Sequence, residues 1–372
     1  MSVILKYNRR FGYIKESVFG ESWTDAGSIA LLARFGYGVE MATKLQVDYR
    51  PIPLPCIRSE GPHYLASGQN YRQFYYEDGL ESYEIVTNIS RIHSFGLLSY
   101  ILGNTYATGT TPGYYIHYIA KVRENTPDPY SFSLYEEQRW AHGSTTYVDR
   151  SLYRGCLLAS VTYDQNMKNS AIKCSTLIYG AKKIDSAITP TNLGNIVTSP
   201  YDGRLTRLWG MECSDYQYDS GSATTTFIMS KFLLLISSKF TMRMGVSLYQ
   251  WNKSHPSVKV VGLMTGRLDI EFAIMETEDE TLTAEWYKWL MDILRGPGIT
   301  KSTELAITLH YKSVDSNILT EVKFRDLWLA EKTEGPIQGE NNLVYYRLHF
   351  GFASPEVTSV EPINSPTWAT GE

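Results

Sequence analysis

Hydrophobic and polar residues alternate in many short segments of this chain, and this pattern predicts β-strands. Clear examples are RLDIEF at 267–272, ELAITLHYK at 304–312 and NLVYYRLHFGFA at 342–353. Two segments instead have the spacing of an amphipathic helix, one ending at Gly103 and one at Gly296. The residues expected to face inward from these helices are Phe95, Leu98, Trp286 and Leu290.

A faint internal repeat organises these predicted elements. Residues 153–159 read YRGCLLA and residues 324–330 read FRDLWLA, so Arg154 matches Arg325 and Leu158 matches Leu329. In both places a polar turn and a second apolar strand ending in glycine follow, and a strand and a helix precede. The repeat predicts a mainly β fold with two tandem β-sandwich modules, each flanked by one short α-helix.

Composition suggests where the modules begin and end. We expect a first module at 1–190, a linker at 191–206, a second module at 207–354 and a polar C-terminal tail at 355–372 that runs over the surface. The linker is rich in Ser, Thr, Pro and Gly. The first module includes an N-terminal arm and a long loop at 51–72, whose closely spaced prolines exclude a central strand. Such a segment is expected to be an ordered loop or hairpin arm that makes contacts.

Charge and cysteine content narrow the class of protein. The 372 residues carry a formal net charge of −4, which gives no basic footprint for holding nucleic acid. The N-terminus lacks the apolar core of a signal peptide and no apolar run could span a bilayer, so a soluble protein is expected. Cys156 and Cys174 are predicted to lie on the two strands of one hairpin as buried free thiols.

Motifs for catalysis or metal binding are not found in the sequence. The seven histidines are scattered without an HExxH pattern, GTTPG is not followed by GK[ST], and no GxSxG is present. The acidic run from Met275 to Glu285 is better interpreted as a helix N-terminus than as a divalent-ion site. We therefore expect no enzymatic activity, no catalytic residues, no metal and no cofactor.

The order of elements resembles the tail tube proteins of tailed phages and tailed archaeal viruses, in particular the larger type with two tube modules per chain. The segments that carry the resemblance are SYEIVTNISRIHSFGLLSYILGN at 82–104, the Gly/Thr loop at 103–113, the hairpin that begins LYRGCLLASVTYDQN at 152, and the closing strand LVYYRLHFGFAS at 343–354. The resemblance covers most of residues 15–354 and is looser at 205–262.

This resemblance implies a structural subunit of a viral tail tube. Subunits would close into homo-oligomeric rings by joining sheets edge to edge, with three chains forming a pseudo-sixfold ring. The rings would stack into a hollow conduit for DNA delivery. The implied partners are the tape measure protein and viral DNA in the lumen, and the tail terminator and distal tail proteins, with no membrane. The protein would be assembled in the host cytoplasm and reside in the tail of the virion.

Two sets of residues are candidates for these roles. Ring stacking is assigned to the arm at 51–72 and to a looser counterpart at 249–258, with the candidate contacts Arg58, Tyr64, Tyr71, Trp251 and His255. The channel wall is expected to be neutral to acidic, so that DNA phosphates are not held, and Glu84, Asp269 and Glu271 are its candidate acids. Two alternatives remain open: a distal tail or terminator ring protein of the same fold, and a carbohydrate-binding β-sandwich.

Overall fold

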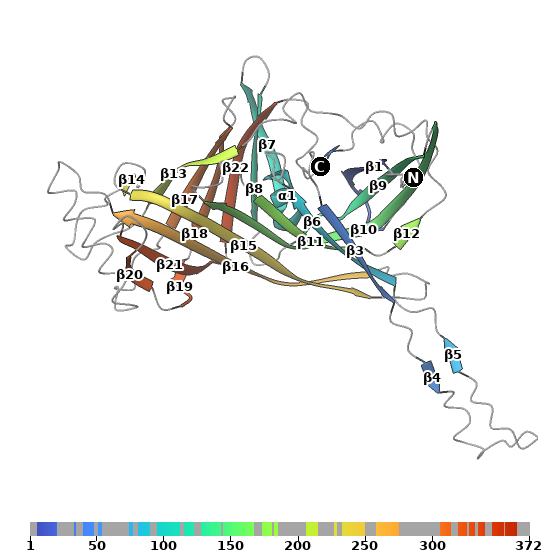
Figure 1. Ribbon diagram of the computed structural model, residues 1–372. Helices are drawn as coiled ribbons and strands as arrows, with labels where there is room; N and C mark the ends of the chain where they lie inside the picture. Colours follow the sequence, from blue (N-terminus) through green and yellow to red (C-terminus); the bar gives the residue numbers. More distant parts are fainter. Residues whose placement is uncertain are drawn as a thin grey trace, which may run out of the picture.

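The computed structural model describes a large part of the chain, with gaps. The described residues are 6–20, 33–34, 40–47, 51–53, 74–76, 81–89, 95–111, 115–122, 128–142, 144–166, 173–180, 182–184, 206–214, 227–228, 233–249, 258–274, 306–313, 319–325, 327–331, 334–338, 344–352 and 354–362. In this part of the chain β-strands predominate and α1, Leu97–Leu102, is the single helix (Figure 1). The predicted mainly β class is confirmed.

The strands are numbered in chain order. They are β1 (Lys6–Lys15), β2 (Ala33–Arg34), β3 (Glu40–Val47), β4 (Pro51–Pro53), β5 (Phe74–Tyr76), β6 (Glu81–Ile89), β7 (Gly103–Thr111), β8 (Tyr115–Val122), β9 (Phe132–His142), β10 (Thr145–Asn166), β11 (Lys173–Gly180), β12 (Lys182–Ile184), β13 (Thr206–Ser214), β14 (Phe227–Ile228), β15 (Leu233–Tyr249), β16 (Val258–Ile274), β17 (Ala306–Ser313), β18 (Leu319–Arg325), β19 (Trp328–Leu329), β20 (Glu334–Gln338), β21 (Val344–Phe352) and β22 (Ser354–Pro362).

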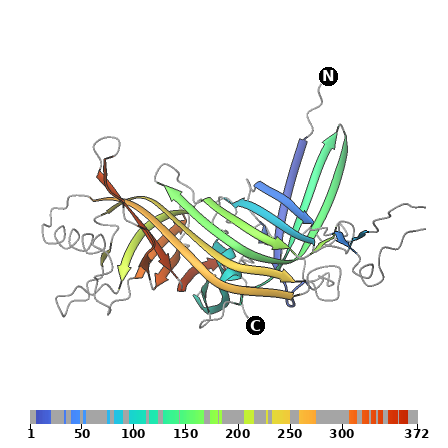
Figure 2. The same ribbon diagram turned by 90° about the horizontal axis from the view of Figure 1, so that it is seen from below.

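The largest sheet contains a run of eight antiparallel strands, here named the main sheet. Its order is β3-β6-β11-β10-β15-β16-β21-β19, and β20 also pairs with β21. The first part of β10 leaves the main sheet and forms a branch with the order β2-β1-β9-β10-β12. Figure 2 shows the strands of this branch standing away from the long curved strands β15 and β16.

The second sheet has the order β14-β13-β17-β18-β22-β8-β7 and lies across the main sheet (Figure 1). Aromatic rings bridge the two layers. The ring of Phe240 in β15 lies 5.3 Å from that of Phe324 in β18, and Phe324 lies 4.7 Å from Phe352 in β21. The hydrophobic core is therefore the space between the main sheet and the second sheet.

The strand order of the first half of the chain recurs in the second half. The branch β2-β1-β9-β10-β12 has the same arrangement as β14-β13-β17-β18-β22, and β3-β6-β11-β10 has the same arrangement as β15-β16-β21-β19. The two arginines that the repeat matches lie at equivalent places, where the chain passes into the main sheet. Arg154 lies in the register shift of the β9–β10 pairing, three residues before Leu157 begins to pair with β11. Arg325 ends β18, three residues before Trp328 pairs with β21 in the main sheet.

Both sheets combine strands from the two halves. In the main sheet β10 pairs with β15, and in the second sheet β8 pairs with β22. One cluster of buried hydrophobic side chains contains residues from both halves, including Tyr163, Phe240 and Tyr311. The division at 191–206 stays a prediction, because residues 185–205 lie outside the described part of the chain.

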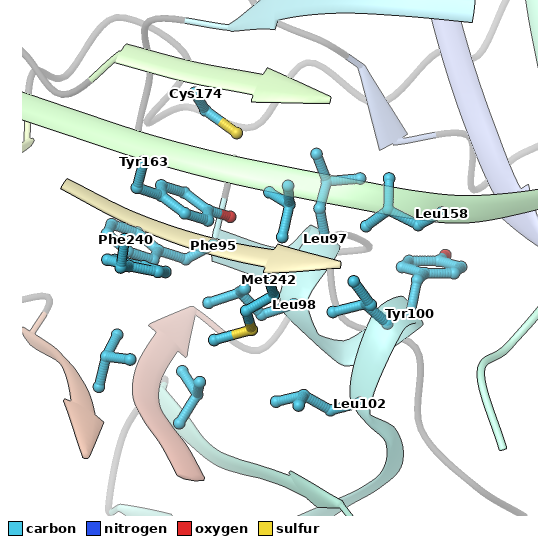
Figure 3. Close-up of a cluster of buried hydrophobic side chains, with 14 of the residues drawn as sticks. Phe95, Leu97, Leu98, Tyr100, Leu102, Leu158, Tyr163, Cys174, Phe240 and Met242 are labelled. Carbon is cyan, nitrogen blue, oxygen red and sulfur yellow. The ribbon is translucent and has the colours of Figure 1, made fainter. Parts of the chain in front are cut away.

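Helix α1 fills the centre of this core (Figure 3). All six of its residues are buried, including Ser99, so the expected amphipathic helix has no exposed face. Phe95, which precedes it, stacks on Tyr163 at 4.9 Å and also contacts Tyr311 at 4.9 Å. The predicted inward positions of Phe95 and Leu98 are confirmed, whereas Trp286 and Leu290 lie outside the described residues.

Three further predictions concern residues around the helix. Gly103 ends α1 with φ +80, which confirms the predicted glycine cap. The Gly/Thr stretch after it is strand β7 rather than the expected loop, because it pairs with β8. Cys156 and Cys174 lie on β10 and β11 as buried free thiols, as predicted, and burial raises the pKa of the Cys156 thiol.

The prediction of a surface tail at 355–372 is wrong for its first part, 355–362. Residues 354–362 form β22, which lies between β18 and β8 in the second sheet with Val357 fully buried. Its prolines stand at the second and last positions of the strand, where they remove few ladder hydrogen bonds. The expected arm at 51–72 begins as β4, which pairs with β5 in a separate two-stranded sheet away from the body (Figure 1).

Candidate functional site

The main sheet has one face on the core and one polar face. Alternation along the strands separates the two, since Tyr163 and Phe240 are fully buried while their neighbours Thr162 and Thr241 are half-buried. The hydroxyl oxygens of Thr162 and Thr241 are 3.0 Å apart across the β10–β15 pair. We name this second face the polar face of the main sheet, and it contains residues from both halves of the chain.

A charged network occupies the polar face at β16 and β21. Arg267 donates hydrogen bonds to Glu331 and, at 2.8 Å, to Asp269, and these contacts raise the pKa of Arg267. Asp269 Oδ1 also lies 2.7 Å from His349 Nδ1. Beside this group, Arg347 donates to Glu271 at 2.7 Å. Two of the three acids predicted for the channel wall, Asp269 and Glu271, are therefore paired with cations.

The charge of this face is mixed. The charged residues that alternation places on it, in the strands whose side chains are described, are Asp164, Lys239, Arg243, Arg267, Asp269, Glu271 and Arg347. Acids do not outnumber Lys and Arg among these residues. Arg347 of the neighbouring strand β21 stands opposite Glu271 and forms an ion pair with it, and Arg267 forms an ion pair with Asp269 along β16 itself. The charges described on the polar face therefore nearly cancel.

The three predicted acids lie in one sheet. Asp269 and Glu271 alternate on β16 and share the polar face. Glu84 lies in β6, where its Cα partners are Tyr179 of β11 and Lys44 of β3. The structure thus brings all three residues into the main sheet, although they come from opposite halves of the chain.

The predicted stacking residues lie outside the described part of the chain, but the strands that flank them are described. Arg58, Tyr64 and Tyr71 belong to the connection between β3 and β6, which includes β4 and β5. Trp251 and His255 belong to the connection between β15 and β16. Four antiparallel pairings separate β3 from β15, so the two strands run in the same direction. Both connections therefore leave the same end of the main sheet.

The β15–β16 hairpin exposes apolar side chains near that end. Tyr249 pairs with Val258, and both are exposed together with Val260 and Leu263, whose side chain is 81% exposed. The hairpin is tied to the first half of the chain on its other side, because Lys259 donates to the Pro129 carbonyl at 2.9 Å and to Asp128 at 3.2 Å. A fixed hairpin with an exposed apolar end is suited to contact another protein surface.

The second sheet carries an unrelated polar pair. His310 Nδ1 lies 3.0 Å from Glu321 Oε1, and this hydrogen bond holds the pKa of Glu321 below its ordinary value. Within the described ranges, His, Cys, Asp and Glu residues form no group that could hold a metal ion. In the same part of the chain no helix has the length and apolar character needed to cross a bilayer.

Several important residues were missed by sequence reasoning. Arg267, Arg347 and His349 complete the charged network, and alternation alone could have placed them on the face of Asp269. Glu16 was also missed. It is buried after β1 and accepts hydrogen bonds from Ser133 and from Gly155, and no sequence pattern reveals those contacts.

Comparison with models of known protein families found no match for this chain, and a search of curated protein sequences also found none. The functional interpretation therefore depends on the geometry of the sheets and on the resemblance of their element order.

Proposed function

We propose that this chain is a structural subunit of the tail tube of a tailed virus. Copies close into homo-oligomeric rings, three chains to a pseudo-sixfold ring, and the rings stack into a hollow conduit for DNA. The observation that carries the proposal is the main sheet, in which both halves of the chain form one continuous wall with a core face and a polar face. A wall of this kind is what a tube lining requires.

The character of the polar face supports a conduit for DNA. A surface with unpaired cations would bind phosphates and slow the movement of DNA, and the affinity would be strongly salt-dependent. On β16 and β21 the cations Arg267 and Arg347 are instead held by Asp269, Glu331 and Glu271. Ion pairing leaves little net charge on the wall, so DNA and a tape measure protein could lie along it without being held.

The ends of the hairpins support stacking. The connection at 48–80 and the β15–β16 hairpin both leave the same end of the main sheet. When copies form a ring, both kinds of connection would point to one neighbouring ring. Deletion of residues 56–70 should then leave folded subunits that form single rings and do not elongate, whereas normal tubes from that variant would exclude the arm.

Negative-stain electron microscopy of the purified protein tests the proposed function. Stacked rings or tubes with a central channel are expected. Discrete closed rings that never stack would favour a distal tail or terminator protein and would contradict the tube assignment. A monomer that binds glycans on a carbohydrate array would favour a carbohydrate-binding β-sandwich and would also overturn the proposal.

A further inference from the structure

The pairing between β10 and β15 joins the two halves of the main sheet. The two strands are antiparallel, and their Cα partners run from Ser160 with Arg243 to Asn166 with Ser237. Thr162 pairs with Thr241 near the middle of this junction. Because the strand order recurs, β10 is the last strand of one four-strand unit and β15 is the first strand of the next.

The same two kinds of strand lie at the ends of the main sheet. In the first half β3 pairs with β6, which lies next to β11. In the second half β15 pairs with β16, which lies next to β21. Strands β3 and β15 therefore hold equivalent positions. In the second half β19 and β20 have the position of β10, because each pairs with β21. Within the described part of the chain β3 pairs only with β6, and β19 and β20 pair only with β21.

We infer that the β20 edge of one copy pairs with the β3 edge of a second copy of this chain, in the antiparallel geometry of the β10–β15 junction. Open sheet edges present unpaired N–H and C=O groups that favour pairing with another strand. The contact is heterologous, because it joins two different edges, so repeated copies form a ring where the rotation closes. The inference rests on the proposed function and specifies which surfaces close the ring.

The junction inside the chain sets the register of this contact. Leu158 and Leu329, matched in the sequence, stand opposite Ile178 and Phe350, so these two residues are equivalent. Three residues before Ile178 is Ser175, which pairs with Thr162. Three residues before Phe350 is Arg347, which pairs with Glu334. Glu334 therefore has the position that Thr162 has at the junction.

The other side of the contact follows in the same way. Ile178 pairs with Ile85 of β6, and Phe350 pairs with Leu268 of β16. One residue earlier, Glu84 pairs with Lys44 of β3, and Arg267 pairs with Thr241 of β15. Lys44 therefore has the position of Thr241. The contact between copies places Glu334 opposite Lys44, and a charge-complementary pair replaces the threonine pair of the internal junction.

A charge exchange tests the pairing. Lys44→Glu and Glu334→Lys should each weaken association at least tenfold in analytical ultracentrifugation, because each sets like charges opposite one another. The double variant Lys44→Glu with Glu334→Lys should restore association. Circular dichroism shows whether each variant is folded. Two folded single variants that associate normally, or a double variant no better than either, would overturn the inferred register.

A cysteine pair gives an independent measurement. The same register sets Ile337 opposite Ala42, since their counterparts Asp164 and Lys239 are partners at the junction. Oxidation of an Ala42→Cys, Ile337→Cys variant should give covalent oligomers on a non-reducing gel. The chain without substitutions, and a Thr43→Cys, Ile337→Cys variant whose new thiols point to opposite faces, should give far fewer.

The outcomes separate the inference from the proposed function. Tubes in electron micrographs without the 42–337 cross-link would overturn the edge pairing and leave the tube assignment intact. Cross-linked closed rings that never stack would support the edge pairing and contradict the tube assignment. A protein that stays monomeric at millimolar-range concentrations and forms no cross-link would overturn both.

Discussion

The Glu16 carboxylate accepts a hydrogen bond of 2.9 Å from the backbone N–H of Gly155, a residue far away in the sequence. Gly155 has φ +59 and lies where β10 passes from the branch to the main sheet. The same oxygen accepts from the Ser133 hydroxyl at 2.7 Å, and the other oxygen accepts from the Gly20 N–H at 3.0 Å. One carboxylate therefore fixes the bend of β10, the longest of the described strands.

We predict that Glu16→Ala lowers the free energy of unfolding by about 2–4 kcal/mol, because it leaves two buried donors without an acceptor. Glu16→Gln retains a carbonyl oxygen and should cost about half as much. Urea unfolding of the unassembled protein measures both. Glu331→Ala is the matched control, since an exposed ion pair contributes less than about 1 kcal/mol. Equal losses in the Ala and Gln variants would contradict the assigned role.

Gly103 and Gly20 allow a second prediction, because both have positive φ but different surroundings. A Cβ at Gly103 would lie 1.9 Å from the carbonyl oxygen of Asp128, whereas a Cβ at Gly20 would have no atom within 4 Å. Gly20→Ala should cost about 1–2 kcal/mol from backbone conformation alone. Gly103→Ala should cost about 2 kcal/mol more, because the backbone must move. Similar melting temperatures for the two variants would show that the contact at Gly103 relaxes freely.

The strands themselves were predictable from the sequence, because each half-buried strand alternates locally between apolar and polar residues. The β10–β11 hairpin follows from this pattern and contains both buried thiols, Cys156 and Cys174. Strand β22 was not found, because its prolines and polar residues resemble a surface tail. Its burial depends on β18 and β8, which lie elsewhere in the sequence and leave no local signal in it.

The pairing of the halves could not be read from the sequence either. Thr162 and Thr241 are 79 residues apart, and nothing local indicates that their strands are neighbours. The glycines near the ends of β11 and β21, Gly180 and Gly351, do not hold equivalent positions in the main sheet. Leu157 stands opposite Tyr179, and its match Trp328 stands opposite Gly351, so Gly351 corresponds to Tyr179 rather than to Gly180. Gly351 is explained instead by the Trp328 ring that lies against it.

The shared core predicts that the two halves unfold together. Phe95 lies between Tyr163 of the first half and Tyr311 of the second, at 4.9 Å from each ring. Phe95→Ala should lower the free energy of unfolding by about 3–5 kcal/mol. Fluorescence and far-UV circular dichroism should report one coincident transition. Val344 is exposed, and Val344→Ala should change the free energy of unfolding by less than about 0.5 kcal/mol. Two separate transitions, with one unchanged by Phe95→Ala, would contradict a common core.

The neutral polar face predicts how assembled particles respond to DNA. Asp269 and Glu271 neutralise Arg267 and Arg347 on this face. Replacing both acids by lysine would remove the carboxylates that hold Arg267 and Arg347 at these contacts and would add two cations to the polar face. Rings assembled in the presence of double-stranded DNA should then retain it at about 0.15 M salt, with an affinity that falls steeply as salt rises.

The control is Glu356→Lys, which changes a carboxylate of similar exposure on β22 of the second sheet, away from the polar face. Electrophoretic mobility and co-sedimentation measure the retained DNA, and electron microscopy shows whether each variant still assembles. Rings of the unsubstituted protein and of Glu356→Lys should release DNA. If the unsubstituted rings hold DNA as tightly as the Asp269→Lys, Glu271→Lys rings, the polar face does not line a channel through which DNA moves.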